Sequence, residues 1–411
     1  MQEKITALFD ERSFTQLLEN VQEGVITGYG QIESSLVFVV SSDKESMGGS
    51  ISIGHANKVI RLLDKARAAS APVIFLLDSS GVRLEESAQS AQGLGMLINA
   101  IAQFKGNAPL ISIVCGNVGG AFSTICSLCD FNFMLNDAAL YINAPLSVKD
   151  SKEDTSDSKF QASAGYVDYA GSFSDITAKI RGLIPHIPLS YADSRVMNDI
   201  ADDYNRAVDI EGEELNIASI FSKISDEGYT FSYRDGFSPN VHCAIISLGG
   251  ISVAAIGAGG SDEGTYLSGQ DVEKATDFAI LADQLDMPVL LYLNYDGYER
   301  TIHSEVCLRR RLSRFAKVIS QTEVPVVTVY GKQAVGSFQV FAGNAIGADI
   351  TYALEDSNIS LLEAEEIKKI TGIKESNSLE DMLKCGYLDG VIPKSQLRKY
   401  LISAFEMLYT A

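Results

Sequence analysis

The chain has 411 residues, a hydrophobic content of 46% and a formal net charge of −20. This length exceeds one ordinary hydrophobic core and fits two domains of about 200 residues each, and the composition is that of a folded rather than a disordered protein. The negative charge argues against sequence-independent nucleic-acid binding, because phosphates would be repelled over most of the surface.

The segment at the start of the chain, MQEKITALFDERSF, has no apolar stretch of signal-peptide length. No run of about 18 apolar residues occurs elsewhere, so we predict no transmembrane helix and expect a cytoplasmic protein. The close cysteine pair, Cys126 and Cys129, lacks the second pair or nearby histidine that a zinc or redox site needs. We interpret both as buried thiols on a helix and predict no metal site.

The first half of the chain alternates strands and helices. Short strands are predicted within residues 27–43, and a helix from His55 to Ala71, because its apolar residues keep helical spacing. The continuous apolar run Val73–Leu77 is typical of a strand buried on both faces. A second helix, with apolar residues spaced between Leu94 and Ile101, precedes another buried strand that ends in a pair of glycines.

A change of composition then separates the two halves. Residues 149–159 (KDSKEDTSDSK) are polar and charged without periodicity, so we predict an exposed loop. The prolines and acids of residues 184–205 are typical of a connector. We place the domain boundary near residue 196, with one domain over residues 1–196 and a second over residues 197–411.

The second half repeats the order of the first. Short strands are predicted within residues 241–259, a helix from Asp271 to Met287, and a buried strand at Val289–Leu293. This alternation of strands and helices predicts an α/β fold with parallel strands and right-handed crossovers in both halves.

The spacing of prolines shows how closely the halves correspond. Pro72 and Pro109 lie 37 residues apart (109 − 72), as do Pro288 and Pro325 (325 − 288). The offset between the halves is therefore 216 residues throughout this block (288 − 72). A duplicated strand–helix–strand unit predicts two related backbone sites that serve one reaction.

Each copy ends in a turn of small residues, Gly119-Gly120 in the first half and Gly336-Ser337 in the second. Glycine tolerates positive φ and lets a ligand approach bare backbone N–H groups. Such donors, with the positive end of a helix behind them, can stabilise an oxyanion on a thioester or amide carbonyl. The alternative is that the glycines only permit tight packing of strand on helix, which a repeat would inherit equally.

Two other groups of residues are candidates for binding. Ser79, Ser80, Gly81 and Arg83 follow a buried strand, so they are expected at the ligand-binding edge of the sheet, although Arg83 could equally be a surface residue. Arg310 and Arg311 belong to a basic cluster suited to binding phosphates or a carboxylate. The alternative for this cluster is a solvated helix face paired with acids.

Several motifs, in order and spacing, resemble those of one family. LFDERSF, GVITGYGQIESSLVFVVSSD and GGSISIGHANKV are similar to its N-terminal pattern, and DSSGVRLEES resembles its Asp-Ser-Gly-Gly-Ala-Arg motif. VGGAFS resembles its Gly-Gly-Ala turn, and GKQAVGSFQVF stands where the family has Arg-Lys-Ala-Tyr-Gly-Gly-Ala-Tyr. The chain thus resembles the carboxyltransferase subunit of biotin-dependent acyl-CoA carboxylases and of sodium-pumping acyl-CoA decarboxylases.

The resemblance implies two duplicated crotonase-like (ClpP/crotonase) ββα domains and the exchange of a carboxyl group between biotin and the α-carbon of an acyl-CoA. It implies that Gly119 and Gly120 hold the thioester enolate, and that Gly336 and Ser337 hold the ureido oxygen of biotin. The first domain would then be the acyl-CoA domain and the second the biotin domain.

The resemblance also implies partners. No biotin-attachment Met-Lys-Met tract occurs in the chain, so biotin is expected on a separate carrier protein, with a CoA thioester as the substrate. A biotin carboxylase or membrane decarboxylase subunit would be a further chain. A homo-oligomer, a dimer or larger, is expected because the family builds its active site between subunits.

The chain departs from the family in the second turn. Ser337 is taken to replace the second glycine and Phe338 a small residue, which predicts a narrower biotin pocket. NYDGY, at residues 294–298, replaces the usual Asp-Val-Pro-Gly-Phe, and YINAP replaces a turn ending in Thr-Gly-Pro. Two alternatives therefore stay open: a malonate-type decarboxylase acting on a carrier-protein thioester, and a non-catalytic assembly subunit.

Overall fold

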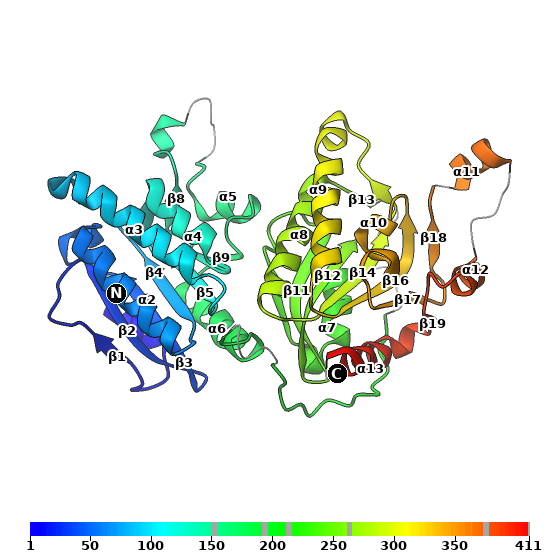
Figure 1. The fold of residues 1–411 in the computed structure, drawn as a ribbon, viewed down its shortest axis with the longest axis horizontal. Helices are drawn as coiled ribbons and strands as arrows, with labels where there is room; N and C mark the ends of the chain where they lie inside the picture. Colours follow the sequence, from blue (N-terminus) through cyan, green and yellow to red (C-terminus); the bar gives the residue numbers. More distant parts are fainter. Residues whose placement is uncertain are drawn as a thin grey trace. The chain divides into compact units, whose positions relative to one another are not determined.

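The computed structural model describes residues 1–148, 154–190, 196–210, 216–260, 265–362, 364–372 and 378–409. The chain divides into two compact units, Met1–Ser194 and Arg195–Ala411 (Figure 1). No helix in the described part of the chain is both long enough and apolar enough to span a bilayer.

The first unit is built on a seven-stranded sheet with the strand order β1-β2-β3-β4-β5-β7-β9. Strands β1 to β3 pair antiparallel, and every pairing from β3 onward is parallel. The strands are β1 (Thr15–Leu17), β2 (Val25–Ile32), β3 (Ser35–Ser42), β4 (Val73–Leu77), β5 (Leu110–Val114), β7 (Phe131–Leu135) and β9 (Tyr169–Gly171).

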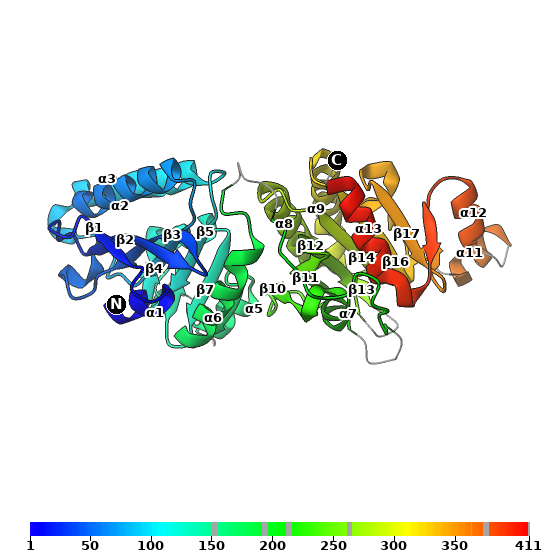
Figure 2. The ribbon, with the colours of Figure 1, turned by 90° about the horizontal axis from the view of Figure 1, so that it is seen from below.

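Helices cover both faces of this sheet. Helices α2 and α3 lie side by side over one face, and α1 and α6 lie over the other (Figure 2). The helices are α1 (Gln2–Leu8), α2 (Ile53–Ala68), α3 (Ala88–Phe104), α4 (Thr124–Leu128), α5 (Ser158–Ser163) and α6 (Phe173–Leu183). Because the central strands are covered on both sides, β4 and β5 are buried along their whole length, as their apolar runs predict.

The second unit repeats this architecture around the order β10-β11-β12-β14-β16-β17-β19. Strands β10 to β12 again pair antiparallel and the later ones parallel. The strands are β10 (Thr230–Tyr233), β11 (Val241–Leu248), β12 (Ile251–Gly259), β14 (Val289–Tyr295), β16 (Val326–Val335), β17 (Ile350–Leu354) and β19 (Gly390–Ile392). The predicted α/β fold with two duplicated domains is confirmed.

Helices α8 and α9 pack together on one face of the second sheet, and α7 and α13 share an apolar core with the other face (Figure 2). The helices are α7 (Ile217–Ile224), α8 (Gly269–Gln284), α9 (Ile302–Gln321), α10 (Gln339–Ala342), α11 (Ala364–Thr371), α12 (Leu379–Lys384) and α13 (Leu397–Tyr409). Two short pairings complete the unit: β18 (Asn358–Ser360) with the end of β16, and β13 (Tyr266–Leu267) with β15 (Gly297–Tyr298).

Both predicted helices before the prolines end about three residues early. Helix α2 stops at Ala68 and α8 at Gln284, because Ser70 and Asp286 adopt positive φ values of 49° and 48°. The N–H groups of Ala71 and Met287 then donate back to carbonyls five residues earlier, at 3.0 and 2.9 Å. This is the Schellman type of helix end, here in residues that are not glycine.

A buried arginine attaches α13 to the rest of the second unit. Arg398 is 0% exposed, and its Nη2 lies 2.5 Å from Oδ1 of Asp226. The Asp226 carboxylate also accepts hydrogen bonds from the Ser247 hydroxyl and from the N–H groups of Gly249 and Gly250. The last helix is therefore held to the β11–β12 hairpin by a buried charge pair.

Candidate functional site

The glycine turn of the first unit lies just beyond the carboxyl end of β5, the edge at which α/β sheets bind ligands. Strand β6 (Asn117–Gly119) pairs with β8 (Ala139–Tyr141), and Gly120 then opens a short 3-10 helix, Gly120–Ser123, that runs on into α4. Because Gly120 and Ala121 begin this helical segment, their N–H groups have no acceptor within it. The Gly120 N–H follows the last pair of the β6–β8 ladder and faces the Tyr141 carbonyl without a close hydrogen bond to it. No described residue accepts a hydrogen bond from the Ala121 N–H.

The two glycines are needed for different reasons. Gly120 has φ of +61°, and a Cβ there would meet nothing within 4 Å, so the backbone conformation and not space selects glycine. Gly119 has an extended backbone, but a Cβ there would collide with the ring of Tyr141 on the paired strand. The turn therefore presents two backbone N–H donors next to an aromatic wall.

The loop after β4 lies against this turn but uses its own N–H groups internally. The Ser79 N–H donates to the carbonyl of Asn117 (2.9 Å), and the Ser80 N–H donates to that of Gly48 (3.1 Å). The Gly81 N–H donates to Oγ of Ser79 (3.1 Å). These residues thus shape the edge of the site, and their role in binding substrate stays a prediction.

Arg83 is similarly engaged within the protein. Its side chain is 12% exposed, and Nη1 lies 3.2 Å from Oε2 of Glu23 and 2.8 Å from Oε1 of Glu86. Its Nε also donates to the Ser50 hydroxyl (3.2 Å). The structure thus shows Arg83 as a partly buried ion-pair residue rather than a free surface cation.

A pocket of about 280 Å³ adjoins the first turn. It is continuous with the turn because the ring of Tyr141 lies against Gly119, and because Ser123 follows Gly120 and donates to its carbonyl (2.7 Å). The walls combine rings and aliphatic groups with hydroxyls, from Ser123, Thr124, Ser127, Leu140, Tyr141, Ile142, Asn143, Val148, Thr155, Phe160, Gln161 and Tyr166. A small, mainly uncharged group fits these walls.

The register of the second turn corrects the predicted pairing of the two turns. Gly119 pairs with Tyr141 in the β6–β8 ladder, and Val335 pairs with Ser360 in the β16–β18 ladder. Gly120 and Gly336 then match in offset (336 − 120 is 216) and in φ, +61° and +62°. Val335 therefore stands at the first glycine position, and Ser337 corresponds to Ala121 rather than to the second glycine.

The second turn also differs in its hydrogen bonds. The Gly336 N–H donates to the carbonyl of Ser360 (2.9 Å), so it is not available to a ligand. Ser337 and Phe338 begin the turn into α10, and no described residue accepts from their N–H groups. Ser337 is exposed and has a strained φ of +34° for a residue with a side chain.

Phe338 does not fill the space in front of this turn. It is 3% exposed, and its ring packs edge-on against the rings of Tyr330 and Tyr387, whose hydroxyls lie 2.7 Å apart. The narrowing predicted from Phe338 is therefore wrong: the ring belongs to the core beneath the turn. Phe122, the equivalent residue of the first turn, is likewise buried.

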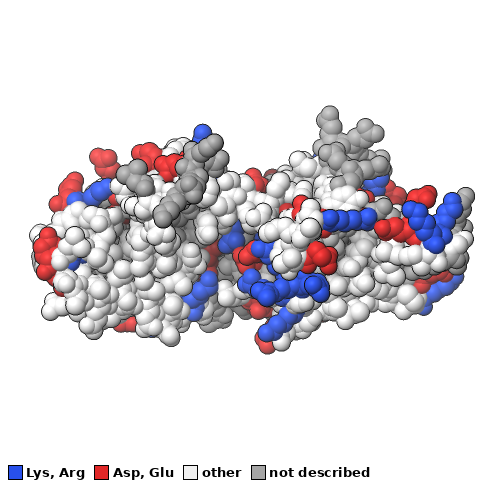
Figure 3. Space-filling model, turned by 90° about the horizontal axis from the view of Figure 1, so that it is seen from above, with Lys and Arg blue, Asp and Glu red and all other residues white. Residues whose placement is uncertain are grey.

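The predicted basic cluster lies on α9, on a part of the second unit where blue Lys and Arg side chains gather beside red acidic ones (Figure 3). Arg311 pairs with Glu273 of α8 (2.9 Å), and Arg314 lies 3.4 Å from Asp277. Arg310 is exposed. Part of the cluster thus forms a helix face paired with acids, and the binding of phosphate by Arg310 and Arg311 stays a prediction.

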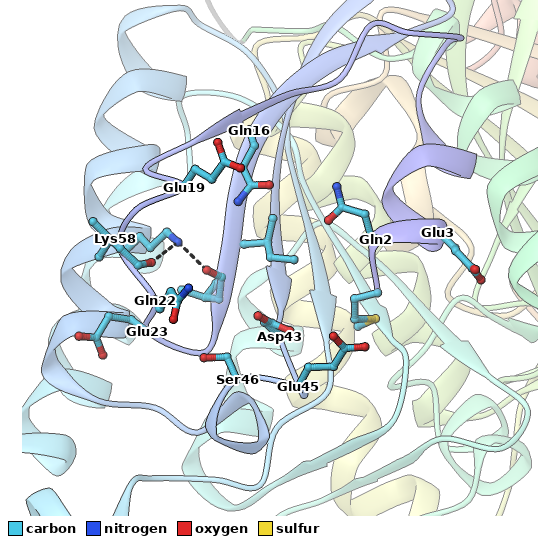
Figure 4. A pocket seen from close by; sticks show the side chains of 14 residues that line it. Gln2, Glu3, Gln16, Glu19, Gln22, Glu23, Asp43, Glu45, Ser46 and Lys58 are labelled. Carbon is cyan, nitrogen blue, oxygen red and sulfur yellow. Dashed lines mark hydrogen bonds between the residues drawn. The ribbon is translucent and has the colours of Figure 1, made fainter.

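A second pocket in the first unit, of about 870 Å³, is lined by carboxylates that include Glu3, Glu19, Glu23, Asp43 and Glu45 (Figure 4). Lys58 lies in its wall, but Nζ donates to the carbonyls of Val21 and Val25, both at 2.7 Å. Burial lowers the pKa of this ammonium. So many acids repel phosphate, which makes this pocket a poor candidate for CoA.

The cysteine pair is as predicted: Cys126 lies on α4, Cys129 caps its end, and both thiols are buried. Burial raises the pKa of Cys126 to about 12, which makes the thiol unreactive at neutral pH. Within the described ranges, no group of three His, Cys, Asp or Glu side chains could hold a metal ion.

Residues 3–382 match the carboxyl transferase domain family. The chain belongs to this family. It is 26% identical to the carboxyltransferase subunit of propionyl-CoA carboxylase from Haloferax mediterranei, over 94% of this chain and 83% of that one. It is 24% identical to the alpha subunit of methylmalonyl-CoA decarboxylase from Veillonella parvula, over 99% of this chain and 89% of that one.

The fold matches the crystal structure of transcarboxylase 12S with a TM-score of 0.93 at 22% identity, covering 100% of this chain and 89% of that chain. The predicted family and the crotonase-like carboxyltransferase fold are therefore confirmed. The relatives are acyl-CoA carboxyltransferases and a decarboxylase, which confirms the predicted class of enzyme.

Two residues at this turn were not among the candidates predicted from the sequence. Ala121 supplies one of the two unpaired N–H groups, and Asp78 contacts the segment that leads to the turn. Both could have been found by applying the offset of 216 strictly, because it matches Ala121 with Ser337 and Asp78 with Asn294.

Proposed function

We propose that this chain transfers a carboxyl group between an acyl-CoA and biotin carried on a separate protein. The observation that carries the proposal is the pair of unpaired N–H groups at Gly120 and Ala121, next to a small pocket, in a member of the carboxyl transferase family. The thioester oxygen would bind these two donors, with the acyl group in the pocket lined by Tyr141, Leu140 and Phe160.

The reaction requires charge stabilisation more than acid–base side chains. When the bond between the carboxyl carbon and the α-carbon breaks, its electron pair forms an enolate whose negative charge lies on the thioester oxygen. Two N–H donors aimed at that oxygen stabilise the charge as it develops, and one such donor contributes about 2.7–4 kcal/mol. Biotin on the carrier would supply the ureido nitrogen that takes the carboxyl group and the proton that the α-carbon receives.

The biotin half rests on the second turn. Gly336 keeps the positive φ of the first turn, but its N–H is already bonded, so the donors for the ureido oxygen would be Ser337 and Phe338. This revises the pair that the resemblance implied, Gly336 and Ser337, by one residue.

A decisive experiment measures carboxyl exchange by the purified protein between methylmalonyl-, malonyl- or glutaconyl-CoA and free biotin. We expect exchange with at least one of these thioesters, and loss of it in Gly120→Val, because a β-branched side chain at φ of +61° displaces the donors. Gly106→Val is the matched control, since Gly106 also has positive φ (89°) and open space around it but lies at the end of α3. A folded Gly120→Val variant with full activity would refute the enolate site.

One observation favours a second candidate, a decarboxylase acting on a carrier-protein thioester without biotin. Val335 replaces the first glycine of the second turn and the Gly336 N–H is occupied, so the biotin half is the more altered one. Turnover of a malonyl-carrier protein, with no exchange into biotin, would select this function over the first.

The assembly is part of the same proposal. The transcarboxylase 12S structure is described as a hexamer that binds methylmalonyl-CoA. We extend to this chain a cytoplasmic homo-oligomer that works with a biotin carrier and with a carboxylase or membrane decarboxylase partner. Light scattering of the purified protein tests the oligomer, and co-purification with a biotinylated carrier domain tests the partner.

A further inference from the structure

Asp78 is a buried carboxylate at the end of β4 that contacts the backbone leading to the first turn. Its Oδ1 accepts a hydrogen bond from the N–H of Asn117 (3.0 Å). The neighbouring Ser79 N–H donates to the carbonyl of the same residue (2.9 Å). Both backbone groups of Asn117 are thus fixed by the β4 loop, three residues before Gly120.

Packing reinforces this contact. Asp78 is 8% exposed, and a Cβ at Gly116 would collide with its carboxyl group. The peptide from Gly116 to Asn117 therefore lies directly on the carboxylate, with no room for another residue type at Gly116. A shift of Asp78 would be passed to the backbone that ends in the Gly120 and Ala121 donors.

The second unit contains the same contact with a different residue. Oδ1 of Asn294 accepts a hydrogen bond from the N–H of Gln333, also at 3.0 Å. Both residues lie 216 positions after their counterparts (294 − 78 and 333 − 117). What the two copies share is an acceptor oxygen at this position, because the charge is present in the first copy only.

The side chain has a different second partner in each copy. In the first, Nζ of Lys44 lies 2.7 Å from Oδ1 of Asp78, the oxygen that also accepts from Asn117, so the charge is paired. In the second, Gly260 stands at the position of Lys44 (260 − 44 is 216), and its carbonyl accepts from Nδ2 of Asn294 (2.8 Å). The ion pair is therefore specific to the first copy, whereas the acceptor oxygen is common to both copies.

We propose that Asp78 is a positioning residue for the carboxyl-transfer reaction: its acceptor oxygen holds Asn117 and so sets the direction of the Gly120 and Ala121 N–H groups. The inference rests on the proposed function, since it assigns a role to those donors. The negative charge of Asp78 has no part in it, and Asn294 shows which neutral side chain suffices.

Two substitutions separate the acceptor from the charge. Asp78→Asn, with Lys44→Gly to reproduce the pairing of the second unit, keeps the acceptor oxygen. Asp78→Leu keeps about the same size but removes the acceptor of the Asn117 N–H. The matched control is Asn294→Leu, which makes the same lesion in the second unit.

Amide hydrogen exchange and carboxyl-exchange kinetics are measured on the full chain. In Asp78→Leu we expect amide hydrogen exchange of residues 115–118 to be about tenfold faster, and kcat about 100-fold lower with KM within about twofold. The Lys44→Gly, Asp78→Asn protein should keep slow hydrogen exchange and most of kcat. Asn294→Leu should speed hydrogen exchange at residues 331–336 and leave residues 115–118 protected.

The outcomes distinguish this inference from the proposed function. An inactive wild-type protein would refute the carboxyl-transfer function. The amide hydrogen exchange rates would still decide whether Asp78 holds the turn. Unchanged amide hydrogen exchange and unchanged kcat in folded Asp78→Leu would overturn the inference. So would a loss of kcat of about 100-fold in the folded Lys44→Gly, Asp78→Asn protein. That result decides the question even where the leucine variant does not fold.

Discussion

The buried pair of Arg398 and Asp226 predicts a large and specific loss of stability. In Arg398→Met the Asp226 carboxylate, 3% exposed, keeps its bonds from Ser247, Gly249 and Gly250 but loses its counter-charge. The Ile224 carbonyl also loses the hydrogen bond from Nη1 of Arg398 (2.6 Å). Breaking one side of a buried pair costs about 3–5 kcal/mol, so we expect the unfolding free energy of the second unit to fall by that amount.

Urea unfolding followed by circular dichroism, together with hydrogen exchange of the α13 peptides, measures this change. Arg314→Met is the control within the same unit, because Arg314 is 52% exposed and its pair with Asp277 should be worth less than about 1 kcal/mol. The double variant Arg398→Met, Asp226→Asn should recover part of the loss, since it leaves no lone buried charge and keeps an acceptor oxygen for the neighbouring donors. Equal effects of Arg398→Met and Arg314→Met would refute the reasoning.

Two further predictions concern stability. Burial lowers the pKa of His55 to about 4 from its ordinary 6.5, so the folded chain holds a neutral imidazole that the unfolded chain protonates. The free energy of unfolding is therefore at its full value above about pH 6.5 and decreases as the pH falls toward 4. The decrease between pH 7 and pH 5 should be about 2 kcal/mol. Urea titrations at both pH values should show this decrease in the wild type and a smaller one in His55→Leu; identical pH dependence would contradict it. Ser337→Gly should raise the melting temperature by the equivalent of about 1 kcal/mol, because it relieves a φ of +34°, whereas Ser238→Gly, at φ of 49° in the same unit, controls for relief of strain away from the turn.

The repeat made most of the fold predictable. Continuous apolar runs such as Val73–Leu77 and Val289–Leu293 identified buried parallel strands, because only helices on both faces can bury every residue of a strand. The helix ends were misplaced because the left-handed residues there are Ser70 and Asp286, which carry no glycine signal. The domain boundary near residue 196 comes from the composition of the connector, and the roles of the two domains come from the resemblance. Both stay predictions.

The site was predictable only where function depends on local backbone. Gly120 could be recognised from sequence because positive φ selects glycine. The surroundings of Arg83 could not be predicted from the sequence, since its partner Glu23 is 60 residues away. Their pairing depends on how β2 and β4 are placed. The pairing of Asp78 could not be predicted either, since its partner Asn117 begins β6, 39 residues further along the chain.

The two turns differ in a way that packing explains. In the first ladder Gly119 lies opposite the large Tyr141, and in the second Val335 lies opposite the small Ser360. Each pair thus combines a smaller side chain with a larger one, with the larger residue on opposite strands in the two copies. The following residue did not change, because Gly120 and Gly336 both hold φ near +60°. Loss of the first glycine is therefore compensated within its own ladder and does not by itself abolish the second turn. The feature that sets the copies apart is the Tyr141 ring beside the donors, which forms a wall of the first site and has only a serine in its place in the second.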